Sequence, residues 1–158
     1  MSRSSRRAFL QRSAAVAASA AFVPYFAAAG EAPASKNDRP LVGCIGNGGM
    51  GRGDAGAASR FGDIVANCDV DRKRAEALAA NVLKGKPKPQ IFDDYRKLLD
   101  RKDVEIVTIS TPDHWHTRIA IDAARAGKDI YCQKPMTLTI DEGKTLCKVQ
   151  KETGRVFQ

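Results

Sequence analysis

Residues Gly46-Asn47-Gly48-Gly49-Met50-Gly51 decide the fold of this chain. They fit the pattern G-x-G-x-x-G and directly follow the apolar run Leu41-Val42-Gly43-Cys44-Ile45. Between a strand and a helix, the first glycine permits a tight turn, the second lets the backbone approach a diphosphate, and the third lets the helix pack on the strand. Amide groups at the start of that helix would face the anion. The motif therefore predicts a dinucleotide site at Gly46, Gly48, Gly49, Met50 and Gly51.

An acidic residue follows this loop at the distance that a ribose-binding carboxylate needs. The run Ile64-Val65-Ala66 leads into Asp69, which stands 18 residues after Gly51. A carboxylate there accepts from the ribose hydroxyls and repels a 2′-phosphate, so NAD is the expected cofactor. Arg72 lies nearby and keeps NADP as an alternative. A glycine-rich turn without a ligand is the other interpretation of the loop alone, but strand, helix and acid together favour cofactor binding.

Short apolar runs alternate with stretches of helical period from residue 41 onward. The strands are rich in β-branched residues and do not alternate in polarity, which is typical of buried parallel strands. The alternation predicts an α/β fold with a doubly wound parallel sheet of the Rossmann type. Strands are expected at 41–45, 64–66, 105–109 and 129–132, and helices near 72–83, 95–99, 114–126 and 140–153. Thr139 and Glu142 form a capping box for the last helix.

The composition indicates one soluble globular domain in a chain of 158 residues, with 43% apolar and 28% charged residues. The net charge of +8 would suggest nucleic-acid binding if it were clustered on one face. However, Arg3, Arg6, Arg7 and Arg12 lie in the first 29 residues, which contain no acid. The remaining 22 basic and 18 acidic residues are spread along the chain. No nucleic-acid partner is expected.

The amino terminus has the features of an export signal. Residues Ser5-Arg6-Arg7-Ala8-Phe9-Leu10-Gln11 match the twin-arginine pattern except at Gln11, and an alanine-rich stretch follows to Ala29. We expect a twin-arginine signal peptide at 1–29, a linker at 30–39 and the cofactor-binding domain at 40–158. The protein would then use the twin-arginine (Tat) machinery, reach the periplasm and keep no stable membrane anchor. A permanent alanine-rich membrane helix or a mitochondrial presequence is the alternative.

Neither a disulfide nor a metal site is expected. Three of the four cysteines lie in or after apolar runs, and no C-x-x-C pair is present. His114 and His116 are separated by one residue at a helix start, so their side chains point in different directions. The sequence contains no further cluster of metal ligands to complete a site with these two histidines.

Two later segments resemble a known family. Ser110-Thr111-Pro112-Asp113-His114-Trp115-His116 follows one predicted strand and Gln133-Lys134-Pro135 follows the next. With the glycine motif they resemble the Gfo/Idh/MocA family of NAD(P)-dependent oxidoreductases over residues 41–158. The resemblance implies that Thr111 and Pro112 lie along the cofactor and that His116, the family's histidine, belongs to the cofactor site. It also implies that Lys134 is a catalytic lysine beside the nicotinamide ribose and the substrate hydroxyl.

One departure from the family affects that lysine. Gln133 stands where the family has glutamate, which places the pH behaviour of Lys134 in question. Without the resemblance, Lys134 next to Pro135 would be interpreted as a solvated turn residue. Trp115 fits either core packing or a lid over the ligand.

The resemblance also implies a second α/β domain that supplies the substrate pocket and further catalytic residues, and through which subunits usually associate. Residues 154–158 have the pattern of a sixth strand that is cut short. We therefore expect a Rossmann domain truncated at its carboxyl end, without the substrate domain. The first functional hypothesis is the NAD(P)-binding half of an exported oxidoreductase acting on CH–OH groups of sugars, cyclitols or related polyols. The second is a truncated, non-catalytic cofactor-binding module.

Overall fold

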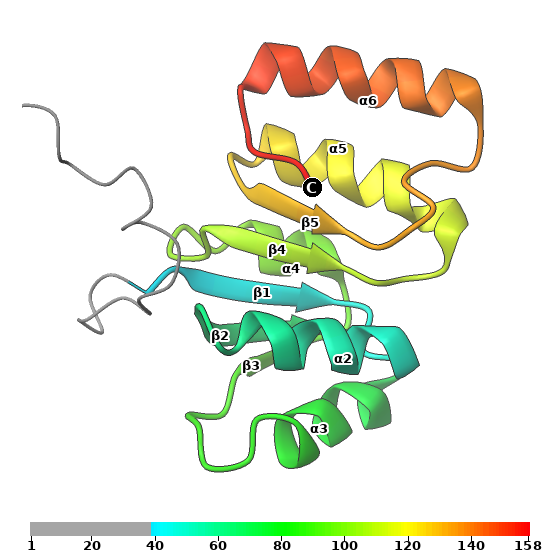
Figure 1. Ribbon diagram of the computed structural model, residues 1–158. Coiled ribbons are helices and arrows are strands. Elements are labelled where there is room, and N and C mark those ends of the chain that lie inside the picture. Colours follow the sequence, from blue (N-terminus) through cyan, green and yellow to red (C-terminus); the bar gives the residue numbers. More distant parts are fainter. Residues whose placement is uncertain (1–38) are drawn as a thin grey trace, which may run out of the picture. The chain divides into compact units, whose positions relative to one another are not determined.

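The computed structural model describes residues 39–158, so the expected signal peptide and all but the last residue of the expected linker lie outside the described part. Five parallel strands form one sheet in the order β3-β2-β1-β4-β5 (Figure 1). The elements are β1 (Leu41–Ile45), α2 (Gly49–Ala58), β2 (Asp63–Cys68), α3 (Arg72–Asn81), β3 (Gln90–Phe92), α4 (Tyr95–Leu99), β4 (Ile106–Ile109), the 3₁₀ turn η2 (Asp113–Trp115), α5 (His116–Arg125), β5 (Asp129–Cys132) and α6 (Ile140–Thr153). The doubly wound parallel sheet predicted from the sequence is confirmed.

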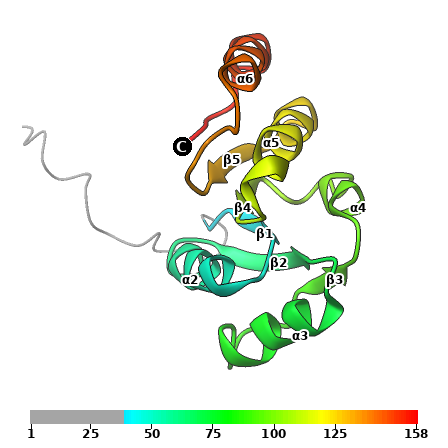
Figure 2. The ribbon, with the colours of Figure 1, turned by 90° about the vertical axis from the view of Figure 1, so that its right-hand side faces the viewer.

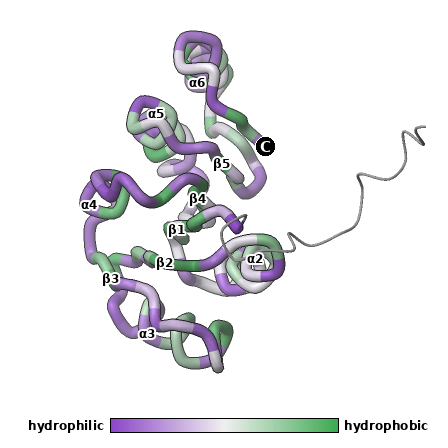
Figure 3. The backbone as a smooth tube through the Cα atoms, turned by 90° about the vertical axis from the view of Figure 1, so that its left-hand side faces the viewer, coloured by the Kyte–Doolittle hydropathy of each residue, from purple (hydrophilic) through white to green (hydrophobic). Residues whose placement is uncertain are grey.

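Helices cover both faces of the sheet (Figure 2). On one face, Ala55 of α2 and Leu78 of α3 pack with Val42, Cys44 and Ile64 of the strands. On the other face, α4 and α5 pack against β2 and β4, and α6 packs on α5. Hydrophobic residues concentrate in the central strands β1, β2 and β4 (Figure 3). The continuous apolar runs of the sequence are therefore explained by strands that are buried on both sides.

Many fully buried positions of this core hold alanine. Ala55 of α2, Ala66 of β2 and Ala75 of α3 have no exposed surface, and the same is true of Ala120 and Ala123 on α5. A methyl group is the smallest side chain with a Cβ, so these helices can lie close to the strands beneath them. Close approach of the helices to the sheet therefore contributes to this core beside its larger leucine and isoleucine side chains.

Local signals in the sequence fix the ends of several helices. Asp71 begins α3 by accepting the Lys73 N–H at 3.0 Å, and α6 begins with the capping box between Thr139 and Glu142. Gly154 ends α6 in the left-handed conformation, with φ of 64°. Strand β3 was not among the strands named from the sequence. It has three residues, none of them buried, and is therefore too short to give an apolar run.

Both ends of the described chain are joined to the sheet. Arg39 donates to the carbonyl oxygens of Ser59, Arg60 and Gly62 and pairs with Asp63. At the other end, Phe157 forms a parallel bridge to Ile130 of β5, as a sixth strand would begin. Among residues 39–158, no helix combines the length and hydropathy of a membrane span.

Candidate functional site

The glycine loop is confined between the ends of β1 and β4. Gly46 has φ of 86°, and a Cβ there would lie 2.6 Å from the Ser110 carbonyl carbon. A Cβ on Gly51 would overlap the Gly46 carbonyl oxygen. Positions 46 and 51 therefore accept only glycine, for the reasons that the motif predicts: a tight turn and a close helix.

The loop is open in the direction of a ligand. A Cβ on Gly48 would meet nothing nearer than Arg74 Nη1, 3.8 Å away. The N-cap residue of α2 is Gly48, which has no side chain to bind the free amides of the first helical turn. The amides of Gly49, Met50 and Gly51 precede the first intrahelical bond, from Arg52 N–H to Gly48 O at 3.0 Å, and so can bind an anion.

Asp69 is held by the backbone around it. Its Oδ2 accepts the Asn47 N–H at 2.7 Å and its Oδ1 accepts the Asp71 N–H at 2.9 Å. These two amides fix the carboxylate beside the glycine loop, at the carboxyl end of β2. Each carboxylate oxygen has a further lone pair for a ligand hydroxyl.

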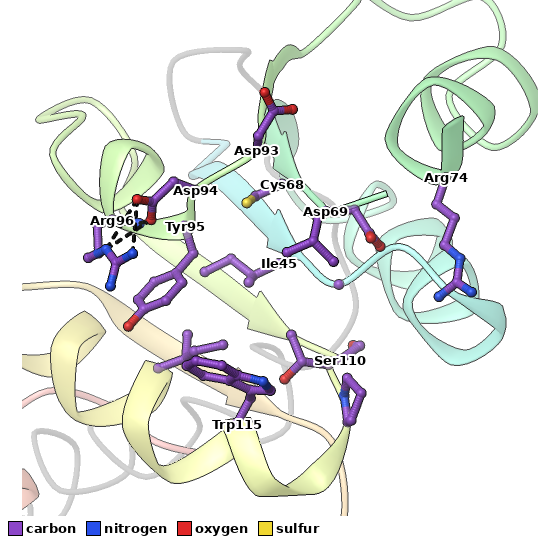
Figure 4. Close-up of a pocket in the computed structure, with 15 residues that line it drawn as sticks. Ile45, Cys68, Asp69, Arg74, Asp93, Asp94, Tyr95, Arg96, Ser110 and Trp115 are labelled. Carbon is purple, nitrogen blue, oxygen red and sulfur yellow. Dashed lines mark hydrogen bonds and ion pairs between the residues drawn. The ribbon is translucent and has the colours of Figure 1, made fainter. Parts of the chain in front are cut away.

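A cavity of about 390 Å³ lies at the carboxyl ends of β1, β2 and β4 (Figure 4). The strand order reverses here, between β1 and β4, where doubly wound sheets bind their ligands. The wall is formed by Ile45, Gly46, Cys68, Asp69, Val70, Arg74, Asp93, Asp94, Tyr95, Arg96, Ser110, Thr111, Pro112, Trp115 and Ile119. Asp69, Thr111 and Pro112, all predicted from the sequence, are thus brought together.

Arg74, and not the predicted Arg72, lines this cavity. Arg72 is not part of the cavity wall. Its Nε lies 3.1 Å from Glu76 Oε1, and its Nη1 lies 3.7 Å from Oδ1 of Asp93, a residue of that wall. The difference follows from helix geometry, since residues 72 and 74 lie on different faces of α3. The helix that starts after Asp71 offers the one signal for Arg74, because residues two positions apart in a helix point in different directions.

Two buried polar groups near the cavity have no partner among the described residues. They are the side-chain amide of Asn47 and the hydroxyl of Thr111. A buried polar group without a hydrogen bond costs about 1–3 kcal/mol, so both favour a ligand or water nearby. The Thr111 hydroxyl belongs to a residue of the cavity wall and is the better placed of the two.

Burial disfavours the thiolate form of the cysteine in the cavity wall. Burial, and after it the neighbouring Asp69 carboxylate, raise the pKa of the Cys68 thiol to about 12. Burial also raises the pKa of Cys44 to about 11 and that of Cys132 to about 12. All four cysteines are free, and residues 39–158 contain no group of three His, Cys, Asp or Glu side chains that could hold a metal ion.

The His116 ring is buried between two backbone carbonyl oxygens. Its ring is 1% exposed, with Nδ1 2.7 Å from Pro135 O and Nε2 2.8 Å from Thr111 O. The residue therefore joins the segment after β4 to the segment after β5 and does not line the cavity. An imidazolium donates to both carbonyl oxygens, whereas a neutral ring donates to only one. His116 is therefore a backbone clamp between these two segments, and its place in the cofactor site stays a prediction.

Lys134 lies on the segment after β5, at the same edge of the sheet as the glycine loop. Its side chain is exposed, the Lys134–Pro135 peptide is cis, and the structure pairs no acid with it among residues 39–158. Its N–H donates to Gln133 Oε1 at 2.9 Å. Gln133 Nε2 lies 3.1 Å from Asp54 Oδ2, and Ser110 Oγ donates to the same oxygen at 2.6 Å. Sequence reasoning missed Asp54, which stands three residues after the glycine motif.

The fold and this site define an NAD-binding Rossmann domain. Residues 41–158 match the family model described as "Oxidoreductase family, NAD-binding Rossmann fold". The chain belongs to the Gfo/Idh/MocA family.

Curated relatives share part of their length with this chain. A "Glycosyl hydrolase family 109 protein" of Shewanella pealeana is 36% identical over 114 residues, covering 68% of this chain and 25% of the relative. An "Alpha-N-acetylgalactosaminidase" of Shewanella oneidensis is 36% identical over 85 residues, covering 51% and 18%. The chain therefore spans about a quarter or less of the curated relatives it matches.

Solved structures agree with the fold. An NAD-binding protein from Listeria innocua superimposes with a TM-score of 0.66 at 30% identity, covering 76% of this chain and 33% of that one. A levoglucosan dehydrogenase in complex with NADH and levoglucosan superimposes with a TM-score of 0.65 at 29% identity, covering 75% and 34%.

Proposed function

We propose that this chain is the NAD-binding half of an exported oxidoreductase that acts on CH–OH groups of sugars, cyclitols or related polyols. The observation that carries the proposal is the cavity at the strand-order reversal, where the Asp69 carboxylate and the open glycine loop lie together. The substrate class is supported by the neighbour whose complex contains NADH and levoglucosan.

The residues of the site fit the cofactor. The amides of Gly49, Met50 and Gly51 bind the diphosphate, and Asp69 accepts from the adenosine ribose. The unpartnered Thr111 hydroxyl gains a hydrogen bond on the cavity wall. NAD, when bound, supplies a hydride acceptor for a carbinol carbon. Lys134 holds the proton of the substrate hydroxyl at its Nζ, from the segment that His116 joins to Thr111.

The names of the curated relatives favour a second candidate function, a glycosidase that binds the same cofactor. Those at 36% identity carry the names of glycosyl hydrolase family 109 and of an α-N-acetylgalactosaminidase. A glycosidase that uses its dinucleotide only transiently needs the same cofactor half as a dehydrogenase, so the two candidates share every residue discussed above.

Titration of the chain with NADH tests the cofactor site. Trp115 is the only tryptophan and lines the cavity. Its emission should therefore be quenched by bound NADH, with a Kd in the micromolar range. Replacing Asp69 by alanine should raise the Kd about tenfold or more, because a charge-assisted hydrogen bond to the ribose is lost.

The matched control removes the same charge outside the cavity. Asp100 is exposed and is not part of the cavity wall, so Asp100→Ala should leave the Kd within about twofold. An unchanged Kd for Asp69→Ala would remove Asp69 from the site. Failure of the unsubstituted chain to bind NADH would remove the proposed function.

The choice between NAD and NADP is tested by repeating the titration with NADPH. Asp69 should make NADPH the weaker ligand, because its carboxylate repels the 2′-phosphate. Arg74 faces the same part of the cavity and is the cation able to offset that repulsion. Arg74→Ala should therefore weaken NADPH binding more than NADH binding. Equal losses for both would assign Arg74 to the diphosphate.

Assays on the protein isolated from its natural source distinguish the activities. Its intact mass, compared with 17.1 kDa, tells whether further sequence belongs to it. Equal amounts of NADH and oxidised polyol indicate a dehydrogenase, and release of N-acetylgalactosamine without net NADH indicates the glycosidase. Cofactor binding without either reaction supports the alternative from the sequence, a truncated, non-catalytic cofactor-binding module.

Export through the twin-arginine pathway is part of the proposal and rests on Arg6 and Arg7, which lie outside the described residues. Replacing both by lysine should keep the protein in the cytoplasm of a bacterium that has this pathway. Replacing Arg3 and Arg12 by lysine is the matched control and should leave export intact. Export of the Arg6→Lys, Arg7→Lys variant would contradict the assignment.

A further inference from the structure

A carboxylate on α2 is joined to the segments after β4 and β5. Asp54 Oδ2 accepts the Ser110 hydroxyl at 2.6 Å and the Gln133 amide at 3.1 Å. The same amide approaches Asp54 Oδ1 at 3.4 Å. All three side chains are half-buried. Asp54 is therefore the acceptor that connects three segments far apart in the sequence.

The orientation of the Gln133 amide is fixed on both sides. Its Nε2 donates to Asp54, while its Oε1 accepts the Lys134 N–H at 2.9 Å. A glutamate at position 133 could still accept from the Lys134 N–H, but it could not donate to Asp54 when ionised. It would place a second carboxylate about 3 Å from the first, and two carboxylates at that distance share a proton rather than both ionising.

We propose that Asp54 is a positioning residue for the Lys134 segment and that its carboxylate requires an amide, rather than a second carboxylate, at position 133. Gln133 connects the Asp54 carboxylate to the Lys134 segment, because its amide donates to Asp54 and accepts from the Lys134 backbone. The residue that position 133 tolerates then depends on the residue at position 54, and the reverse also holds. The part of the proposal that concerns Lys134 in proton transfer rests on the proposed function, and the coupling of positions 54 and 133 does not.

The experiment compares Gln133→Glu, Asp54→Asn and the double variant in the whole chain. Denaturant unfolding is measured between pH 5 and pH 8, together with NADH binding. With Gln133→Glu alone, one of the two carboxylates has a raised pKa in the folded state. Stability is then retained at pH 5 and lost as the pH rises through that value. NADH binding at pH 8 should weaken about tenfold because the Lys134 segment is displaced.

The double variant places an amide at 54 and a carboxylate at 133, so it restores one donor and one acceptor. Its stability should lose the pH dependence of Gln133→Glu, and its Kd for NADH should return to within about threefold of the starting value. Asp54→Asn alone should weaken binding without adding a pH dependence in this range. If Gln133→Glu fails to fold while the double variant folds, the coupling is supported.

Gln90→Glu is the matched control. Gln90 Oε1 lies 3.3 Å from Arg101 Nη1, so the same change there sets a carboxylate beside a cation. Its stability should not fall between pH 5 and pH 8. Additive effects of the two substitutions, a pH-independent loss for Gln133→Glu, or no recovery in the double variant would each overturn the proposal. A chain that shows the coupling but binds no NADH would leave positions 54 and 133 paired and reject the proposed function.

Discussion

The two ends of the cofactor crevice are built in different ways. At the glycine-loop end, formed by residues 46–51 and Asp69, the backbone makes the site: absent side chains admit close contacts, and amides hold the one carboxylate. At the β4–β5 end, formed by residues 110–116 and 133–135, side chains from distant segments hold the loops together. The first end should therefore fail abruptly when changed, and the second should weaken by degrees.

The largest effect is expected at the glycine-loop end. Gly51→Ala drives a methyl group into the Gly46 carbonyl oxygen, and no side-chain rotation can relieve a contact with the backbone. We expect a loss of about 3 kcal/mol or more in the free energy of unfolding, measured with denaturant, and loss of NADH binding.

The control lies in the same helix. Gly53→Ala meets nothing within 4 Å, so helix propensity should leave stability unchanged or raise it by up to about 1 kcal/mol. Equal stability of the Gly51→Ala and Gly53→Ala variants would refute the tight packing of the loop.

A smaller but clear effect is expected for the clamp at the β4–β5 end. His116→Ala leaves the carbonyl oxygens of Thr111 and Pro135 without their buried donor, at a cost of about 2–4 kcal/mol. His114→Ala, on an exposed side chain, should change stability by less than about 0.5 kcal/mol. The comparison is made by thermal and denaturant unfolding. A His116→Ala variant as stable as His114→Ala would show that other contacts hold these segments.

Ser110→Ala should have a moderate effect at the same end. It removes one of the donors to Asp54 and costs about 1–2 kcal/mol, because the acceptor is charged. NADH binding should persist, since the glycine loop is untouched. A complete loss of binding would mean that the two ends are not independent.

The smallest effects concern thiol accessibility, measured by labelling with a disulfide reagent at pH 8. Cys147 is exposed and should react first, followed by the half-buried Cys132, the last residue of β5, and then by the buried Cys68 and Cys44. The raised pKa values of the last three, about 11 to 12, leave little thiolate at this pH, so their labelling should speed up as the pH rises. Faster reaction of Cys68, beside Asp69, than of Cys132 would contradict this order of burial.

The same contrast explains how much the sequence could reveal. The glycine loop, Asp69, the strands β1, β4 and β5 and the capping box of α6 depend on neighbours in sequence, and their patterns predicted them. Asp54, Arg74 and the clamp role of His116 depend on contacts across 19 to 79 positions or on the direction of one side chain. No local pattern records such contacts, because register and helix rotation are decided only when the elements pack.

The buried alanines limit how this chain can evolve. Replacing Ala120 or Ala123 by valine would add volume where α5 lies against the sheet, and glycine would loosen the helix, so neither direction is neutral. In a library of random substitutions, such positions should tolerate fewer residues than the larger leucines of the same core. We therefore expect the buried alanines to vary least among related sequences and the charged surface residues to vary most.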